Sequence, residues 1–341
     1  MGMKSGLVLL FPFALIYNGI TSLRNRLYDW GFFKTEIPKL PSIGVGNLSV
    51  GGTGKSVLVD YLCDLLKEEY RVVVLSRGYK RTTKGVQIAS EDSTAQTLGD
   101  EPFQFFSKHE IAVLVSENRG EGLQALKKIK PFPDLIVFDD LMQHRRVKPH
   151  CMVLTTTYDQ PYYADHLLPW GRLRESKKGA GRAQIIIVTK CPPKITLEEQ
   201  EQIKEKINPT PAQAVFFSKI VYDEQLYNKS STQRLEAVTQ PFILITGIDN
   251  PLPLVHFLED KKMDFTHLKY SNHHQFTEDE IVHIKKIKQG RLLVTTEKDF
   301  GRLLPYFTTE ELFYLPIKME FIGEGVSEQF SVLVKKGIKV F

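Results

Sequence analysis

The sequence predicts an α/β protein in which a doubly wound parallel sheet is joined to a second, smaller α/β domain and preceded by an amphipathic helix. Three observations support this prediction. Apolar runs rich in β-branched residues alternate with helical stretches, which is typical of a parallel sheet covered on both faces. A second set of such runs begins near residue 242, after an irregular polar stretch. Ahead of the first run, apolar residues recur at helical spacing.

The composition is that of a folded globular chain. Hydrophobic residues make up 42% and charged residues 25% of 341 residues, which excludes a disordered, collagen-like or disulfide-scaffold protein. Cys63, Cys151 and Cys191 are scattered, so neither a zinc site nor a disulfide framework is indicated, and a reducing, cytoplasmic context is expected. The net charge of +5 fits a phosphate-bearing or membrane-surface partner better than nucleic acid.

Residues 1–35 are predicted to form a helix at a membrane surface. The apolar run from Gly6 to Tyr17 is shorter than the roughly 20 residues that a spanning helix needs. An interfacial helix needs an apolar face with flanking cations and aromatic residues, but a helix packed in a core has a similar stripe. The sequence leaves both interpretations open. The stripe consists of Ile16, Ile20, Leu23, Leu27 and Trp30.

Residues 36–220 are predicted to form the first α/β domain. Its expected helices lie near residues 55–69, 119–129 and 198–207. Continuous apolar runs of four to eight residues predict buried strands. These strands are expected at 42–46, 71–76, 111–116, 135–140, 151–157 and 184–190.

Residues 221–240 are predicted to be a linker or a connecting ribbon, because the sequence from 208 to 240 is irregular and polar. The second, smaller domain is expected over residues 241–341. Its expected helices lie near 251–260 and 277–288, between strands at 242–248, 265–271, 291–299 and 312–321.

The segment SVGGTGKS lies between the first predicted strand and the first predicted helix. Glycines there let backbone N–H groups surround phosphate oxygens at a helix N-terminus, which is typical of a P-loop NTPase fold. Lys55 would reach the β and γ phosphates, and Ser56 would ligate Mg²⁺. The strict motif has Gly at the position of Ser49, so a glycine turn without nucleotide is the alternative. The predicted nucleotide-binding residues are Ser49, Val50, Gly51, Gly52, Thr53, Gly54, Lys55 and Ser56.

An acidic pair, Asp139 and Asp140, ends the apolar run LIVFDD. A P-loop enzyme holds Mg²⁺ with a carboxylate at the end of such a strand. Adjacent residues of a strand point in different directions, so one carboxylate could face the metal while the other orients a neighbour. Which of the two faces the metal stays open. A polar turn after a buried strand is the alternative.

Other polar residues follow predicted strands, where ligands of a doubly wound sheet bind. Arg77 and Tyr79 follow the second strand and Arg119 the third, while Arg174 follows a Pro-Trp-Gly turn. All four are candidate substrate contacts. Tyr79 is one because of its position after a strand, and the three arginines also because Arg forks suit phosphate. Asp100 precedes an aromatic-rich helix and either caps it or accepts a hydroxyl proton.

Taken together and in order, these segments resemble the tetraacyldisaccharide 4′-kinase family over most of the chain. The segments that carry the resemblance are LRNRLYDWG, PSIGVGNLSVGGTGKS, LSRGYKR, GDEP, FDDLMQHRR, GRLRES, VTKCP, SNHHQF and TTEKD. The resemblance implies an ATP- and Mg²⁺-dependent kinase of lipid A biosynthesis. Its acceptor would be the 4′-hydroxyl of an acylated glucosamine disaccharide 1-phosphate. It also implies a location on the cytoplasmic face of the inner membrane, with no nucleic acid and no obligate protein partner.

The resemblance also implies roles for individual residues. Asp100 matches the base, His273 matches the histidine that pairs with it across the domain cleft, and Lys55 matches the phosphate-loop lysine. The neighbouring His274 leaves the choice between the two histidines open. The chain departs from the family pattern at Leu141, Asn272 and Ser176, where Gly, Asp and Pro are usual.

Two other functions fit the same motifs. A P-loop kinase of a soluble metabolite would pack the N-terminal stripe inside the fold. A membrane-associated switch ATPase would need no acceptor base.

Overall fold

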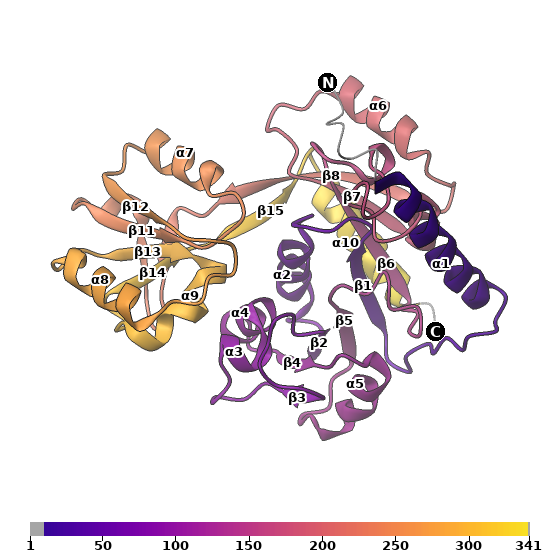
Figure 1. The fold of residues 1–341 in the computed structure, drawn as a ribbon, viewed down its shortest axis with the longest axis horizontal. Helices are drawn as coiled ribbons and strands as arrows, with labels where there is room; N and C mark the ends of the chain where they lie inside the picture. Colours follow the sequence, from indigo (N-terminus) through magenta and orange to yellow (C-terminus); the bar gives the residue numbers. More distant parts are fainter. Residues whose placement is uncertain (1–9, 340–341) are drawn as a thin grey trace.

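The computed structural model describes residues 10–339 and confirms the α/β prediction: two α/β units are joined by a two-stranded ribbon of β8 and β15 (Figure 1). The nine-stranded sheet of the first unit contains β1 (Ser42–Asn47), β2 (Val72–Ser76), β3 (Gln87–Ile88), β4 (Ala112–Val115), β5 (Leu135–Phe138), β6 (Cys151–Thr157), β7 (Ile185–Thr189), β8 (Ala214–Tyr222) and β15 (Ile317–Phe321). The helices of this unit are α1 (Phe11–Asp29), α2 (Lys55–Leu66), α3 (Ala95–Leu98), α4 (Asp100–Lys108), α5 (Arg119–Ala125), α6 (Leu197–Ile207) and α10 (Val326–Ile338).

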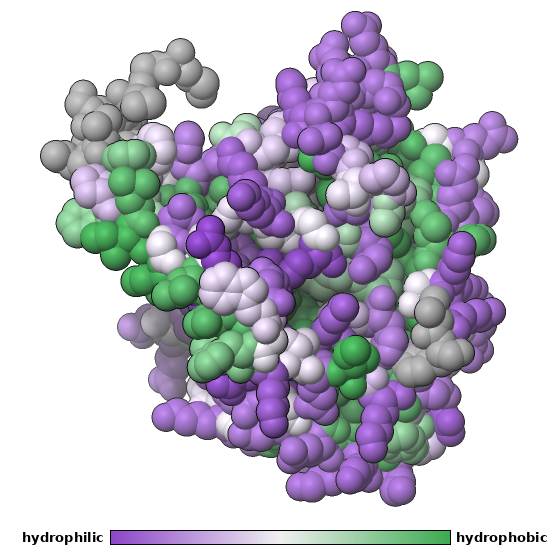
Figure 2. Space-filling view, turned by 90° about the vertical axis from the view of Figure 1, so that its right-hand side faces the viewer, coloured by the Kyte–Doolittle hydropathy of each residue, from purple (hydrophilic) through white to green (hydrophobic). Residues whose placement is uncertain are grey.

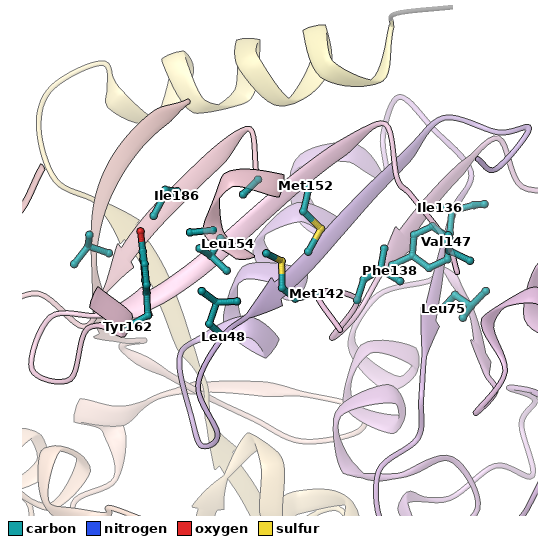
Figure 3. Close-up of a cluster of buried hydrophobic side chains, with 14 of the residues drawn as sticks. Leu48, Leu75, Ile136, Phe138, Met142, Val147, Met152, Leu154, Tyr162 and Ile186 are labelled. Atoms are coloured by element: carbon teal, nitrogen blue, oxygen red, sulfur yellow. The ribbon is translucent and has the colours of Figure 1, made fainter. Parts of the chain in front are cut away.

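The strand order of this sheet is β15-β8-β7-β6-β1-β5-β2-β4-β3, and every pairing from β8 to β4 is parallel. Side chains alternate between two hydrophobic cores, as the pleat of a strand requires. Leu75, Phe138 and Leu154 belong to the core in Figure 3, with α5 and α6 on the same face. Residues of α2 and α10 cover the opposite face.

The second unit has a six-stranded sheet of order β10-β9-β14-β13-β11-β12. Its strands are β9 (Gln225–Tyr227), β10 (Thr232–Arg234), β11 (Phe242–Thr246), β12 (Phe265–Lys269), β13 (Leu293–Thr296) and β14 (Leu312–Leu315). Its helices are α7 (Leu252–Asp260), α8 (Glu278–Lys288) and α9 (Glu297–Leu303).

The prediction of one strand over 312–321 is wrong. Pro316 lies between β14, which belongs to the second sheet, and β15, which pairs antiparallel with β8 of the first. Proline has no N–H for a ladder hydrogen bond, which makes it a natural break between strands. Since α10 then packs on the first sheet, the end of the chain lies beyond residue 241 in sequence but completes the first unit in space.

Two further predictions differ from the structure in detail. The stretch 208–240, predicted as a linker or a connecting ribbon, contains the nine-residue strand β8, which pairs with β15 in the ribbon between the two units. The strand expected over 291–299 ends at Thr296, whose hydroxyl accepts a hydrogen bond from the Asp299 N–H and caps α9.

Helix α1 turns its polar face toward the protein. The Tyr17 hydroxyl donates to the Arg174 carbonyl oxygen at 2.8 Å, and Asn25 Nδ2 donates to Glu175 Oε2 at 2.8 Å. The apolar stripe faces outward, with Ile16 62% and Ile20 64% exposed. The core-packed alternative is therefore wrong for this stripe, whose side chains are not buried in the fold.

Figure 2 views the side of the molecule on which α1 lies, and hydrophobic side chains gather at its upper left. Among residues 10–339, no helix has both the length and the apolar character needed to cross a membrane. Part of the predicted apolar run, residues 6–9, lies outside the described residues.

Candidate functional site

The phosphate loop joins β1 to α2. Gly51 (φ +99°) and Gly54 (φ +83°) have left-handed backbone conformations that favour glycine. Thr53 anchors the loop from below: its hydroxyl accepts a hydrogen bond from Asn47 Nδ2 at 2.7 Å, and its carbonyl accepts one from the Thr189 hydroxyl at 2.9 Å. The loop conformation is thus fixed from β1 and β7.

The segment around Arg172 forms a wall beside the loop. The Val50 N–H donates to the Arg172 carbonyl at 2.8 Å, and Arg172 Nη2 donates back to the Val50 carbonyl at 2.9 Å. Ser49 is buried and bridges to Leu173. The residue that departs from the strict glycine motif therefore pairs with this wall.

Asp140 is the anionic centre of the first charge cluster. Arg174 donates from Nη1 to Oδ2 at 2.9 Å and from Nη2 to Oδ1 at 2.8 Å, and Lys55 Nζ lies 3.6 Å from Oδ1. Although burial opposes ionisation, these cations hold the pKa of Asp140 well below its usual range. The fold thus brings the predicted Lys55, Asp140 and Arg174 together.

Asp139 has a different environment. Its carboxylate accepts a hydrogen bond from the Ser76 hydroxyl at 2.8 Å and forms no salt bridge within residues 10–339. Burial, followed by the charge of Asp140, raises the pKa of Asp139 to about 6. A buried carboxylate without a cationic partner, beside a second carboxylate, suits a divalent cation.

Arg119 lies inside the first unit and not on an open surface. It is 3% exposed, and its two terminal nitrogens donate to the carbonyls of Ser116 (2.7 Å) and Asp139 (2.8 Å). Burial lowers its pKa to about 10. In this conformation it supports the backbone of the acidic pair. Arg77 and Tyr79, by contrast, are exposed.

A second charge cluster forms where α4 meets α9. His273 Nδ1 lies 2.6 Å from Asp100 Oδ2, and Arg302 donates from Nε to Oδ1 at 2.9 Å and from Nη2 to Oδ2 at 2.7 Å. Despite its burial, hydrogen bonds from His273 and Arg302 lower the pKa of Asp100 to about 2. The ring of Tyr79 packs edge-on to His273, with centroids 6.0 Å apart.

His274 belongs to a different environment. Its Nε2 lies 2.9 Å from Glu280 Oε2, and its ring stacks on Tyr270. Of the two histidines, only His273 contacts Asp100 in the part of the chain that the structure describes.

Two residues of this cluster were missed. Neither Arg302 nor Lys298 was among the predicted site residues, although Lys298 Nζ lies 3.1 Å from His273 Nε2. A local signal for Arg302 was present in the sequence, because Asp299 and Arg302 are spaced i,i+3 on one helix. In the structure they form a buried ion pair at 2.9 Å, as buried charges need partners.

The departures from the family pattern have local explanations at two positions. Leu141 is 2% exposed and belongs to the same hydrophobic core as Phe138 and Met142, where its side chain fills space beside Gly44. The Ser176 hydroxyl accepts from the Lys178 N–H and caps the 3₁₀-helix Lys177–Arg182. Nothing in the structure explains Asn272.

A cavity of about 910 Å³ lies between α1 and the segments around residues 33–36, 118–120 and 146–147. Ile20, Leu23 and Leu27 line its α1 side. The cationic side chains in its lining are Arg24, Lys34 and Arg146, and the carboxylate is Glu36.

Comparisons with known proteins agree along nearly the whole chain. A family model described as tetraacyldisaccharide-1-P 4′-kinase matches residues 7–335. The tetraacyldisaccharide 4′-kinase of Flavobacterium johnsoniae is 42% identical, covering 95% of this chain and 96% of that protein. The protein of the same name from Bacteroides thetaiotaomicron is 39% identical, covering 92% and 88%. The crystal structure of the "apo" form of LpxK from Aquifex aeolicus in complex with ATP has a TM-score of 0.78 at 29% identity, covering 97% and 99%.

Proposed function

Since the chain belongs to the tetraacyldisaccharide-1-P 4′-kinase family, we propose that it transfers the γ-phosphoryl group of ATP to the 4′-hydroxyl of an acylated glucosamine disaccharide 1-phosphate, a lipid A precursor. The observation that carries the proposal is the pairing of two clusters. Lys55, Asp139 and Asp140, which follow the neighbouring strands β1 and β5, are assigned to phosphate and metal. Asp100 and His273, which are in contact, are assigned as the acid–base pair.

The residues present fit ATP and Mg²⁺. Gly51 and Gly54 leave the loop backbone open to phosphate oxygens at the N-terminus of α2. Ser56 and the acidic pair supply the oxygen ligands that Mg²⁺ prefers. We assign Asp139 to the metal, because Arg174 and Lys55 already neutralise Asp140. Held by these residues, Mg²⁺ would supply neutralisation of the charge on the transferring phosphoryl group.

Asp100 is assigned as the group that accepts the hydroxyl proton. As the 4′-oxygen bonds to the γ-phosphorus, the bond to the bridging oxygen breaks, its electron pair stays on ADP, and the proton passes to Asp100. Its low pKa makes it a weak base, so positioning and charge neutralisation carry most of the rate, as a loose transition state requires.

The remaining predicted substrate contacts divide into two groups. Arg77 and Tyr79 are exposed and are assigned to the acceptor, Tyr79 because its ring packs against His273. Arg174 and Arg119 bind the acidic pair and are assigned to holding it during transfer. The acceptor is then proposed to enter between the first and second units, where α4 meets α9.

The acceptor is proposed to be met at a membrane, on the cytoplasmic face of the inner membrane. Helix α1 exposes its apolar stripe and has the flanking arginines and terminal aromatics of an interfacial helix. The cavity beside it has an apolar wall and three cations to one carboxylate, which suits an anionic amphiphile.

The test of the activity is transfer from γ-labelled ATP to a detergent-dispersed, acylated glucosamine disaccharide 1-phosphate, with Lys55→Ala alongside. Transfer by the wild type that the variant loses supports the proposal. ATP binding or hydrolysis without transfer would contradict it, and would favour a kinase of a soluble metabolite or a switch ATPase.

The membrane assignment has its own test. Ile16→Ser with Ile20→Ser is expected to reduce co-sedimentation with phospholipid vesicles about tenfold or more, because it removes apolar side chains from the exposed face. The matched control is Val282→Ser with Val332→Ser, two valines that are each 64% exposed away from α1. Equal effects of the two pairs would contradict the assignment.

A further inference from the structure

Arg302 fixes the plane of the Asp100 carboxylate. Its guanidinium makes two parallel bonds to the two oxygens, the geometry in which Arg orients a carboxylate. Arg302 is itself held by Asp299, whose other oxygen accepts from the Gly247 N–H at 2.8 Å and the Thr296 hydroxyl at 2.7 Å. The orientation of a side chain on α4 is therefore set by the second sheet.

Lys298 fixes the tautomer of His273. An ammonium group only donates, so His273 Nε2 is the acceptor of the 3.1 Å bond. The ring hydrogen then lies on Nδ1, from which it is donated to Asp100 at 2.6 Å. Lys298 is held in turn by Glu101, with Nζ 3.2 Å from Oε1. Both ends of this chain of contacts lie on adjacent residues of α4.

Through these contacts, two side chains of α9 hold both members of the proposed acid–base pair. We propose that Arg302 and Lys298 are positioning residues for phosphoryl transfer: Arg302 orients the Asp100 carboxylate, and Lys298 keeps the His273 hydrogen on the nitrogen that faces it. The inference rests on the proposed function, because it takes Asp100 as the proton acceptor. The proposal adds that Asp100 can accept the proton only while α9 is docked on α4. ATP binding, by contrast, needs the first unit alone.

The first test is a double-mutant cycle on kcat. Arg302→Gln is expected to lower kcat on the order of 10²-fold, the cost of misplacing a reacting group by about 1 Å, with the KM for ATP changed less than about twofold. In an Asp100→Asn background the same substitution is expected to change kcat less than about twofold, because a residue that acts through Asp100 has nothing left to position.

Arg302→Lys tests for a folding artefact, because it keeps the positive charge but loses the two-nitrogen contact with the Asp100 carboxylate. Its kcat is expected to lie between those of Arg302→Gln and the wild type. The matched control is Arg291→Gln, an arginine of the second unit that bonds Ile287 and Lys288 carbonyls. Equal losses of kcat for Arg302→Gln in both backgrounds would overturn the proposal, because they would show a structural effect independent of Asp100.

The second test reads the tautomer directly. In ¹⁵N-labelled protein, the His273 ring is expected to show a protonated Nδ1 and an unprotonated Nε2, and Lys298→Met is expected to mix the two tautomers. An unchanged spectrum in Lys298→Met would overturn the role of Lys298. Absence of transfer by the wild type would instead sink the proposed function, so the two failures are distinguishable.

Discussion

The two charge clusters of the site are built in different ways. In the first cluster, called the phosphate cluster after its proposed role, Lys55 begins α2 after β1, and Asp139 and Asp140 directly follow β5. These two strands are neighbours in one sheet. In the interface cluster, Asp100 meets His273 and Arg302 across 173 and 202 residues of sequence and between two sheets. The first is complete within one unit, while the second exists only when two units are docked.

Under the proposed function, this difference separates binding from chemistry. The loop proposed to bind the nucleotide is fixed by strands on both sides. The residues proposed to transfer the proton are held together by a contact between α4 and α9, where elements further apart in sequence meet. A reaction that requires both clusters is therefore sensitive to how the second unit sits on the first.

The largest expected effect tests the ranking of the clusters. Lys55→Ala is expected to lower kcat/KM on the order of 10³-fold or more, because charge neutralisation dominates a loose phosphoryl transfer. Asp100→Ala should cost about 10²–10⁴-fold, the usual contribution of a general base. Steady-state transfer assays compare the two variants. A milder loss in Lys55→Ala than in Asp100→Ala would reverse the ranking.

The next effect tests whether the clusters act independently. His273→Ala is expected to lower kcat about 10- to 100-fold, since Asp100 loses a hydrogen-bond partner, while the Kd for ATP changes less than about twofold. Calorimetric titration with ATP measures the Kd. His274→Ala is the matched control, because His274 contacts Glu280 and not Asp100. A weakened Kd in His273→Ala would mean that the clusters are coupled already in the ATP complex.

A smaller, pH-dependent effect concerns the phosphate cluster alone. Because the pKa of Asp139 is raised to about 6, a Mg²⁺ ion bound by this carboxylate, as proposed, would have to displace a proton below that pH. The apparent affinity for Mg²⁺ with ATP should therefore fall as the pH drops below about 6, by up to tenfold per pH unit. Calorimetry in buffers of different ionisation enthalpy measures the released proton. Asp139→Asn should abolish this release, and the same proton release in Asp139→Asn would rule out Asp139 as its source.

The smallest effect concerns stability, through the buried carboxylate of Glu297 at the contact between α4 and α9. Lys108 of α4 pairs with Glu297 of α9 at 3.1 Å and with Asp60 of α2 at 2.7 Å. Burial raises the pKa of Glu297, so the folded protein binds its proton more tightly than the unfolded chain does. The stability that Glu297 contributes then falls as the pH rises above its usual pKa.

Compared with the wild type, Glu297→Gln is accordingly expected to be more stable at pH 8 than at pH 5, by roughly 1 kcal/mol in the free energy of unfolding. Urea denaturation at the two pH values measures the free energy of unfolding. Glu320→Gln removes an exposed partner of Lys219 and is expected to show no such pH dependence. If Glu297→Gln, compared with the wild type, were less stable at pH 8 than at pH 5, attraction to Lys108 would outweigh burial.

The sequence was sufficient for most of the strands and for the phosphate cluster. Apolar runs of β-branched residues specify buried strands, and parallel strands bring their carboxyl ends to one edge of the sheet. Lys55 and Asp140 could therefore be placed together from local patterns. The break at Pro316 and the strand β8 were missed, because pairing partners from distant segments decide where these strands begin and end.

What the sequence determined by itself was local: strand and helix periods, the glycine loop, and an apolar stripe on the first helix. Only the tertiary structure decided that the stripe faces outward, since the polar face of α1 finds its partners in Arg174 and Glu175. It also decided that His273 and not His274 meets Asp100, and that Arg302 joins them. Contacts between the two docked units produce no hydrophobic periodicity in the sequence of either segment. Burial and charge pairing across the interface therefore become visible only in three dimensions.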